Sequence, residues 1–185
     1  DTNCNPASYT LSLQNMLSAK PDFMIDLGDN FMSEKEPIVN RTTITNRTKL
    51  FRPYFGTLCH SAPLFITIGN HEGELGWRLD GTDSSMPVLA ANIRKTYYPN
   101  PYPNNFYSGN STAENFVGLR ENYYSWEWGN ALFVVIDPYW YTTSANRAGW
   151  GWTLGTTQYS WFKNVIQGST AKFKFVFCHQ LVGGN

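Results

Sequence analysis

Four short apolar runs constrain the fold of this chain more than any other feature. They cover residues 23–27, 64–68, 131–136 and 173–177, and each has the length of a buried strand. Segments with helical spacing of apolar residues precede the first two runs and the last one. Helices that alternate with short apolar strands are typical of layered α/β proteins. We therefore predict an α/β fold.

Capping and breaking residues set the limits of the predicted elements. Asn5-Pro6 begins a first helix that ends before Pro21, and Gly56 ends a second helix that contains Ile44 and Phe55. Further signals predict a helix over 85–97, a helix capped by Thr156 or Thr157 that ends at Gly168, and a β-hairpin that joins 123–128 to 131–136 through Gly129-Asn130.

Length and charge limit the classes of protein and partner. The 185 residues suit one domain, residues 1–185, and 42% hydrophobic content argues against disorder. Fourteen basic residues balance fourteen acidic ones, which argues against binding to duplex nucleic acid or to an anionic membrane. No apolar run approaches the ~20 residues of a membrane span, and no protein partner is indicated.

The cysteines and the polar composition bear on the cellular compartment. Cys4, Cys59 and Cys178 show no metal-binding spacing, which leaves buried thiols or one disulfide as alternatives. The scarcity of Lys and the abundance of Asn, Thr, Tyr and Trp favour an exported protein, periplasmic or secreted, over a cytoplasmic one.

Polar residues with metal-binding or proton-transfer chemistry follow the four apolar runs. Asp29 follows the first, Asn70 and His71 the second, Asp137 the third and His179 the fourth. In open α/β sheets, ligands bind beyond the carboxyl ends of the strands, so these residues are expected to converge. Each alone also has a structural explanation as a turn, cap or hydrogen-bonded residue. Together they favour a metal site.

This combination resembles the calcineurin-like metallophosphoesterase family, in particular a bacterial branch. The resemblance rests on Gly-Asp-Asn at 28–30 after one strand, Gly-Asn-His-Glu at 69–72 after the next, and a late strand that leads to His179. The family's opening Asp-x-His and closing Gly-His-x-His motifs are absent. We therefore expect a partial domain, truncated at both ends.

The resemblance implies a fold, a cofactor and roles for individual residues. The fold would be a β-sandwich flanked by helices in four α/β/β/α layers, here incomplete, with two metal ions (Fe, Mn or Zn) at one edge. Asp29 would bridge both ions, and Asn70 and His179 would bind the second ion. His71 would contact the phosphate and protonate the leaving oxygen, and Glu72 would orient or tune His71.

These roles imply metal-dependent hydrolysis of a small phosphorylated substrate, a phosphate monoester or diester. A metal-bridging hydroxide would attack phosphorus, and an imidazole would assist departure of the alcohol. Candidates for a wall that faces an organic phosphate are Trp77, Arg78 and the segment 97–107, together with Trp140, Trp150 and Trp152 in a later loop. The alternative is that these aromatic side chains pack among themselves under long loops.

Two other classes of function remain open from the sequence. One is a non-catalytic scaffold that keeps the fold without a working metal site. The other is a carbohydrate- or protein-binding module that uses exposed Trp and Tyr side chains. No phosphate-binding loop, Gly-x-Ser-x-Gly elbow or dinucleotide fingerprint is present, so kinases, serine hydrolases and dehydrogenases have no support.

Overall fold

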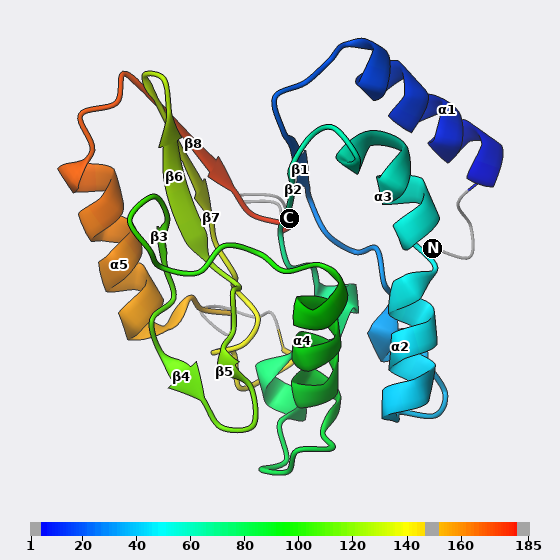
Figure 1. The fold of residues 1–185 in the computed structure, drawn as a ribbon. Coiled ribbons are helices and arrows are strands. Elements are labelled where there is room, and N and C mark those ends of the chain that lie inside the picture. Colours follow the sequence, from blue (N-terminus) through cyan, green and yellow to red (C-terminus); the bar gives the residue numbers. More distant parts are fainter. Residues whose placement is uncertain (1–4, 147–151, 181–185) are drawn as a thin grey trace.

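A computed structural model describes residues 5–146 and 152–180, which form a mixed α/β fold, as predicted (Figure 1). The helices are α1 (Pro6–Ser18), α2 (Arg41–Lys49), α3 (Arg52–Cys59), α4 (Met86–Tyr97) and α5 (Gly155–Gly168), with 3-10 turns η1 (Ser33–Lys35), η2 (Asn70–Glu72) and η3 (Gly76–Arg78). The strands are β1 (Met24–Asp26), β2 (Leu64–Ile66), β3 (Ser108–Gly109), β4 (Ala113–Glu114), β5 (Gly118–Leu119), β6 (Tyr124–Trp128), β7 (Ala131–Val135) and β8 (Phe173–Phe177).

The first three helices follow local sequence signals, with one correction. The Asn5 side chain caps α1, as predicted, and accepts two backbone N–H groups of the first turn at 3.0 and 3.2 Å. The single helix predicted to end at Gly56 is instead two helices, α2 and α3. Pro53, in the first turn of α3, prevents a continuous helix because it lacks an N–H and its ring collides with the preceding turn. Gly56 lies inside α3.

Helix α4 begins one residue later than predicted and ends at the predicted residue, whereas the predicted cap of α5 is wrong. Thr156 and Thr157 lie inside the first turn of α5, which begins at Gly155. The Thr153 hydroxyl accepts the Gly155 N–H at 3.1 Å, and the helix starts two or three residues earlier than the sequence indicated.

Strands β1 and β2 form a two-stranded parallel sheet. Met24 pairs with Leu64 and Asp26 with Ile66, so both strands end at the same edge. The Asn100 side chain covers the other edge of β2: it accepts the Ile66 N–H at 3.0 Å and donates to the Ile66 carbonyl at 2.8 Å. The loops that follow β1 and β2 therefore start side by side.

The second sheet has the strand order β3-β6-β7-β8. The predicted hairpin joins β6 to β7, with Trp128 opposite Ala131 and Gly129 at a φ of 60°, which glycine adopts without strain. Helix α5 connects β7 to β8, so these two strands are parallel. Their parallel course carries the chain after Phe177 towards the loops that follow β1 and β2.

Three apolar interfaces hold these elements together. Between the two sheets, the rings of Phe65 and Trp126 stack with centroids 4.2 Å apart. Helix α3 covers the other face of the two-stranded sheet through Phe55 and Ile66, and α5 packs on Val134 of the second sheet. The two-stranded sheet thus lies between a helical layer and the second sheet, with α5 outside (Figure 1).

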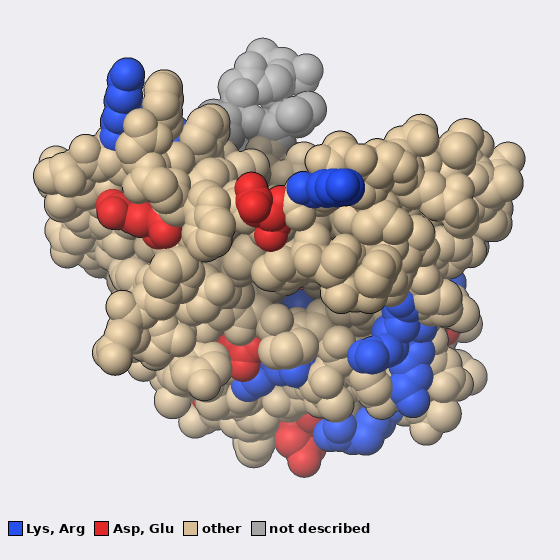
Figure 2. Space-filling model, turned by 45° about the horizontal axis from the view of Figure 1, so that its top comes forward, with Lys and Arg blue, Asp and Glu red and all other residues tan. Residues whose placement is uncertain are grey.

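The surface of the protein carries few charged side chains. Charged side chains cover a small part of the face drawn in Figure 2, in keeping with the 15% of charged residues. No helix in the described ranges is long and apolar enough to cross a membrane. Cys59 and Cys178 are free thiols, and Cys4 lies outside the described residues.

Candidate active site

Asp29 occupies a tight turn after β1. It has a φ of 62°, in the left-handed region that Asp tolerates better than most residues, and Gly28 before it has a φ of 90°. A Cβ on Gly28 would lie 2.6 Å from the Thr67 carbonyl oxygen, so only glycine lets the two loops approach this closely. The Asp26 side chain fixes the turn by accepting the Gly28 N–H at 2.8 Å.

Glu72 joins the two loops through backbone amides. Its carboxylate accepts the N–H groups of Gly69 at 2.6 Å, Asp29 at 2.8 Å and Asn30 at 2.7 Å. Complete burial raises the pKa of Glu72 to about 7, and the negative charges of Asp29 and Asp26 add to this effect against those hydrogen bonds. These hydrogen bonds hold the Asp29 turn, and the expected orienting or tuning of His71 by Glu72 stays a prediction.

His71 lies directly against Asp29. Its backbone N–H donates to Asp29 Oδ1 at 2.9 Å, and its ring Nε2 lies 3.8 Å from Asp29 Oδ2. The ring Nδ1 contacts the carboxylate of Glu34, on η1, which is 11% exposed. A carboxylate accepts hydrogen bonds, so this contact places the proton on Nδ1 and orients Nε2 towards the Asp29 side.

Glu34 is the functional candidate that the sequence reasoning missed. It lies on the short turn η1, in a stretch without apolar periodicity, and its contact with His71 spans 37 residues. Arg78 Nη2 lies 3.9 Å from the other Glu34 oxygen, so a cation stands beside the pair. The one available signal was an acidic residue shortly after the Gly-Asp-Asn segment.

His179 reaches the same carboxylate from the end of the second sheet. Its Nε2 lies 3.1 Å from Asp29 Oδ2, and its Nδ1 lies 2.7 Å from the Leu27 carbonyl oxygen. The hydrogen bond to Asp29 raises the pKa of His179. Partial burial would raise the pKa of Asp29, but its hydrogen bonds from His179 and from the His71 backbone hold it below its ordinary value.

Single donor groups of this site suit a cation, but those among the described residues do not form a complete ligand set. Because Nδ1 of His179 donates to the Leu27 carbonyl oxygen, Nε2 is the ring nitrogen that faces Asp29. Nε2 hydrogen-bonds this carboxylate when it carries a proton, and in the neutral ring it would offer a lone pair to a cation, as in many metal-binding histidines. Asn70 begins η2 next to His71 and is partly buried. Within residues 5–146 and 152–180, however, no three or more His, Cys, Asp or Glu side chains form a group that could hold a metal ion.

Asp137, the carboxylate after the third apolar run, has a different environment. It is fully buried, and Oδ2 accepts from Arg120 at 3.0 Å and from Asn122 at 2.7 Å. Arg120 also pairs with Glu74 at 2.5 Å, and Glu74 pairs with Arg94. Asp137 is therefore part of a buried ionic network and has no solvent-facing side for a ligand.

Some of the aromatic residues proposed as a substrate wall lie in the core, and others lie near the site. Trp140 is 6% exposed, and the Arg120 guanidinium lies 3.8 Å from its ring centroid, so it belongs to the core. Trp150 lies outside the described residues. Partly buried Trp77 packs against Trp152 with ring centroids 5.6 Å apart. The same cluster contains Tyr139, whose ring centroid lies 6.2 Å from that of His179.

Comparison with known proteins adds no assignment. No protein-family model matches the chain, and no curated protein matches it. The geometry of the described residues is therefore the basis for the function proposed below.

Proposed function

We propose that this protein hydrolyses phosphate esters of small molecules, monoesters or diesters, at the edge where β1, β2 and β8 end. One observation carries the proposal: a single carboxylate, Asp29, meets His71 from the loop after β2 and His179 from the end of the second sheet. The motifs around these residues are those that resemble the calcineurin-like metallophosphoesterases.

The order of the layers supports the same proposal. Helices, a two-stranded sheet, a second sheet and helix α5 follow one another, which agrees with an incomplete four-layer α/β/β/α sandwich. In such an arrangement the strand ends of both sheets contribute to one edge, and ligands of α/β proteins bind at such edges.

Asp29, Asn70 and His179 are the residues that would hold metal ions, and Fe, Mn or Zn would suit carboxylate, amide and imidazole donors. Bound divalent ions would supply neutralisation of the phosphoryl oxygens and activation of water at neutral pH. Sites of this type need four or more ligands per ion, so a complete centre would require ligands in addition to these three.

The remaining groups of the site would protonate the leaving oxygen or position the residues that react. Protonated at both ring nitrogens, His71 would donate the Nε2 proton to the leaving oxygen, while the Nδ1 proton stays on the hydrogen bond to Glu34. Glu34 would act as a positioning residue that fixes the tautomer and orientation of this ring. Glu72 would keep the Asp29 turn and the His71 turn in register through its bonds to both.

The test is the Asp29→Asn substitution in the full-length protein. We expect hydrolysis of p-nitrophenyl phosphate and metal retention to be lost together, while the circular dichroism spectrum stays unchanged. Asp22→Asn is the matched control, because Asp22 is exposed and lies at the opposite end of β1. Metal-dependent hydrolysis at the wild-type rate in Asp29→Asn would refute the proposal. A folded wild-type protein that retains no metal would favour the non-catalytic scaffold.

A further inference from the structure

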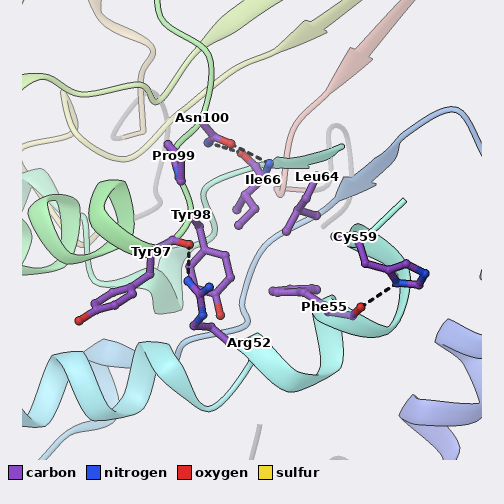
Figure 3. A pocket seen from close by; sticks show the side chains of 11 residues that line it. Arg52, Phe55, Cys59, Leu64, Ile66, Tyr97, Tyr98, Pro99 and Asn100 are labelled. Carbon is purple, nitrogen blue, oxygen red and sulfur yellow. Dashed lines mark hydrogen bonds between the residues drawn. The ribbon is translucent and has the colours of Figure 1, made fainter. Parts of the chain in front are cut away.

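A cavity lies away from the candidate active site. It has a volume of about 380 Å³ and lies between α3, β2 and residues 97–100, where α4 ends (Figure 3). None of the residues that line it belongs to the Asp29 site. It therefore offers a separate place for a ligand.

A glycine in a helix creates part of this space. Gly56 lies in the middle of α3, where glycine is unfavourable compared with alanine, and a Cβ built on it would meet no atom within 4 Å. The side chains of Phe55, Leu64, Ile66 and Tyr98 line the same cavity and point towards one another (Figure 3). The interior is apolar and partly aromatic, with the rings of Phe55 and Tyr98 edge to face at 5.6 Å.

The polar groups at the rim are positive or neutral. Arg52 is exposed and donates from Nη1 to the Tyr97 carbonyl at 3.2 Å, which uses one of its five N–H donors. Lys49 is not a lining residue, but its Nζ lies 4.9 Å from the ring centroid of Tyr97, which is one. Burial raises the pKa of the Cys59 thiol, so this group is uncharged at neutral pH. No Asp or Glu is among the lining residues.

We propose that this cavity binds a small aromatic carboxylate. The ring of the ligand lies among Phe55, Ile66 and Tyr98, and its carboxylate pairs with the free guanidinium edge of Arg52. Apolar walls with one charged group are the usual composition of small-molecule sites, and arginine suits planar carboxylates because its N–H donors form a matching fork. The amide of Asn100 bonds to the Ile66 backbone and is not needed for the ligand.

The experiment is calorimetric titration of the full-length protein with phenylacetate, with neutral 2-phenylethanol and with acetate. We expect phenylacetate to bind in the millimolar range or tighter, 2-phenylethanol to bind about tenfold more weakly, and acetate not to bind. Arg52→Gln should weaken phenylacetate about tenfold and leave 2-phenylethanol unchanged, with exposed Arg41 as control in Arg41→Gln.

Filling the cavity provides the second arm. Gly56→Leu should abolish binding of both aromatic probes, whereas Gly168→Leu, at another helical glycine with open space around its Cβ, should not. Gly56→Ala should raise the melting temperature and retain binding, which shows that α3 accepts a side chain. Amide shifts on phenylacetate addition should map to residues 52–60 and 97–100.

Three results would overturn the proposal. They are no binding of phenylacetate by the folded wild-type protein, phenylacetate binding that survives in folded Gly56→Leu, and amide shifts confined to other regions. Equal affinity for phenylacetate and 2-phenylethanol would overturn the role of Arg52. Because these readouts do not use hydrolysis, they stand or fall independently of the proposed phosphoesterase function.

Discussion

Glu72 and Glu74 lie on one segment after β2, and both are fully buried, yet their environments are opposite. Glu72 accepts backbone amides and has the carboxylates of Asp29 and Asp26 near it, and burial raises its pKa to about 7. Burial would also raise the pKa of Glu74, but the charges of Arg94 and Arg120 outweigh it and lower this pKa. Burial alone therefore does not determine what a carboxylate does in this protein.

The same contrast separates Asp29 from Asp137, the carboxylates after the first and third apolar runs. Asp137 is fully buried and accepts hydrogen bonds from Arg120 and Asn122. Asp29 keeps a quarter of its side chain exposed and faces two imidazoles. Full neutralisation by arginine indicates a structural role, whereas an accessible carboxylate between histidines indicates chemistry. The following predictions test this division.

The largest effect is expected in the buried ionic network. Arg120→Met would leave Asp137 buried without its cationic partner, and breaking such a pair typically costs about 3–5 kcal/mol of unfolding free energy. Urea denaturation followed by circular dichroism measures this loss, with Arg41→Met as the exposed control. A variant as stable as the wild type would show that the network does not hold the fold.

A smaller effect, on activity rather than on stability, is expected at Glu34. Glu34→Gln should lower kcat about 10–100-fold, as is common when the group that orients a functional histidine is changed. The loss should be larger for alkyl phosphates than for p-nitrophenyl phosphate, because a good leaving group needs less protonation. Glu36→Gln, which changes a partly buried pair with Arg47 at 3.7 Å, is the control. Equal losses for both substrates would contradict the positioning role.

The smallest effect is a pH dependence of stability in chelator-treated protein. The folded-state pKa of Glu72 lies above its ordinary value of 4.5, so its contribution to the unfolding free energy is present below pH 4.5 and is lost as pH rises through about 7. The slope over this window is at most about 1.4 kcal/mol per pH unit. Glu72→Gln should remove it.

Glu74 contributes with the opposite sign, because its lowered pKa gives stability above pH 4.5 that is lost in more acidic solution. Stability curves of the wild type and of Glu72→Gln that run parallel between pH 4.5 and 7 would contradict the environment assigned to Glu72.

Much of this architecture follows from local sequence signals. The apolar runs, the Gly129-Asn130 hairpin and the Asn5 cap predict the strands and the first helix, and the parallel pairing of β1 with β2 brings the residues after them together. The prediction of one helix that ends at Gly56 was wrong because glycine weakens a helix by only a small amount, whereas Pro53 interrupts it.

The features of the site that the sequence did not predict depend on contacts between distant segments. The pairing of Glu34 with His71 depends on the path of the loop after Asp29, which carries no periodic signal. The neutralisation of Asp137 depends on Arg120, placed by a short irregular strand connection. Sequence reasoning found carboxylates at strand ends but could not tell which of them arginine neutralises.

The most direct test of the central claim is anomalous diffraction at the Fe, Mn and Zn edges from crystals of the full-length protein grown with these metals. We predict two peaks ~3.5–4 Å apart, both within bonding distance of Asp29 and one of them near Asn70 and His179. Crystals that diffract well and show no anomalous peak near Asp29 would contradict a metal-dependent phosphoesterase.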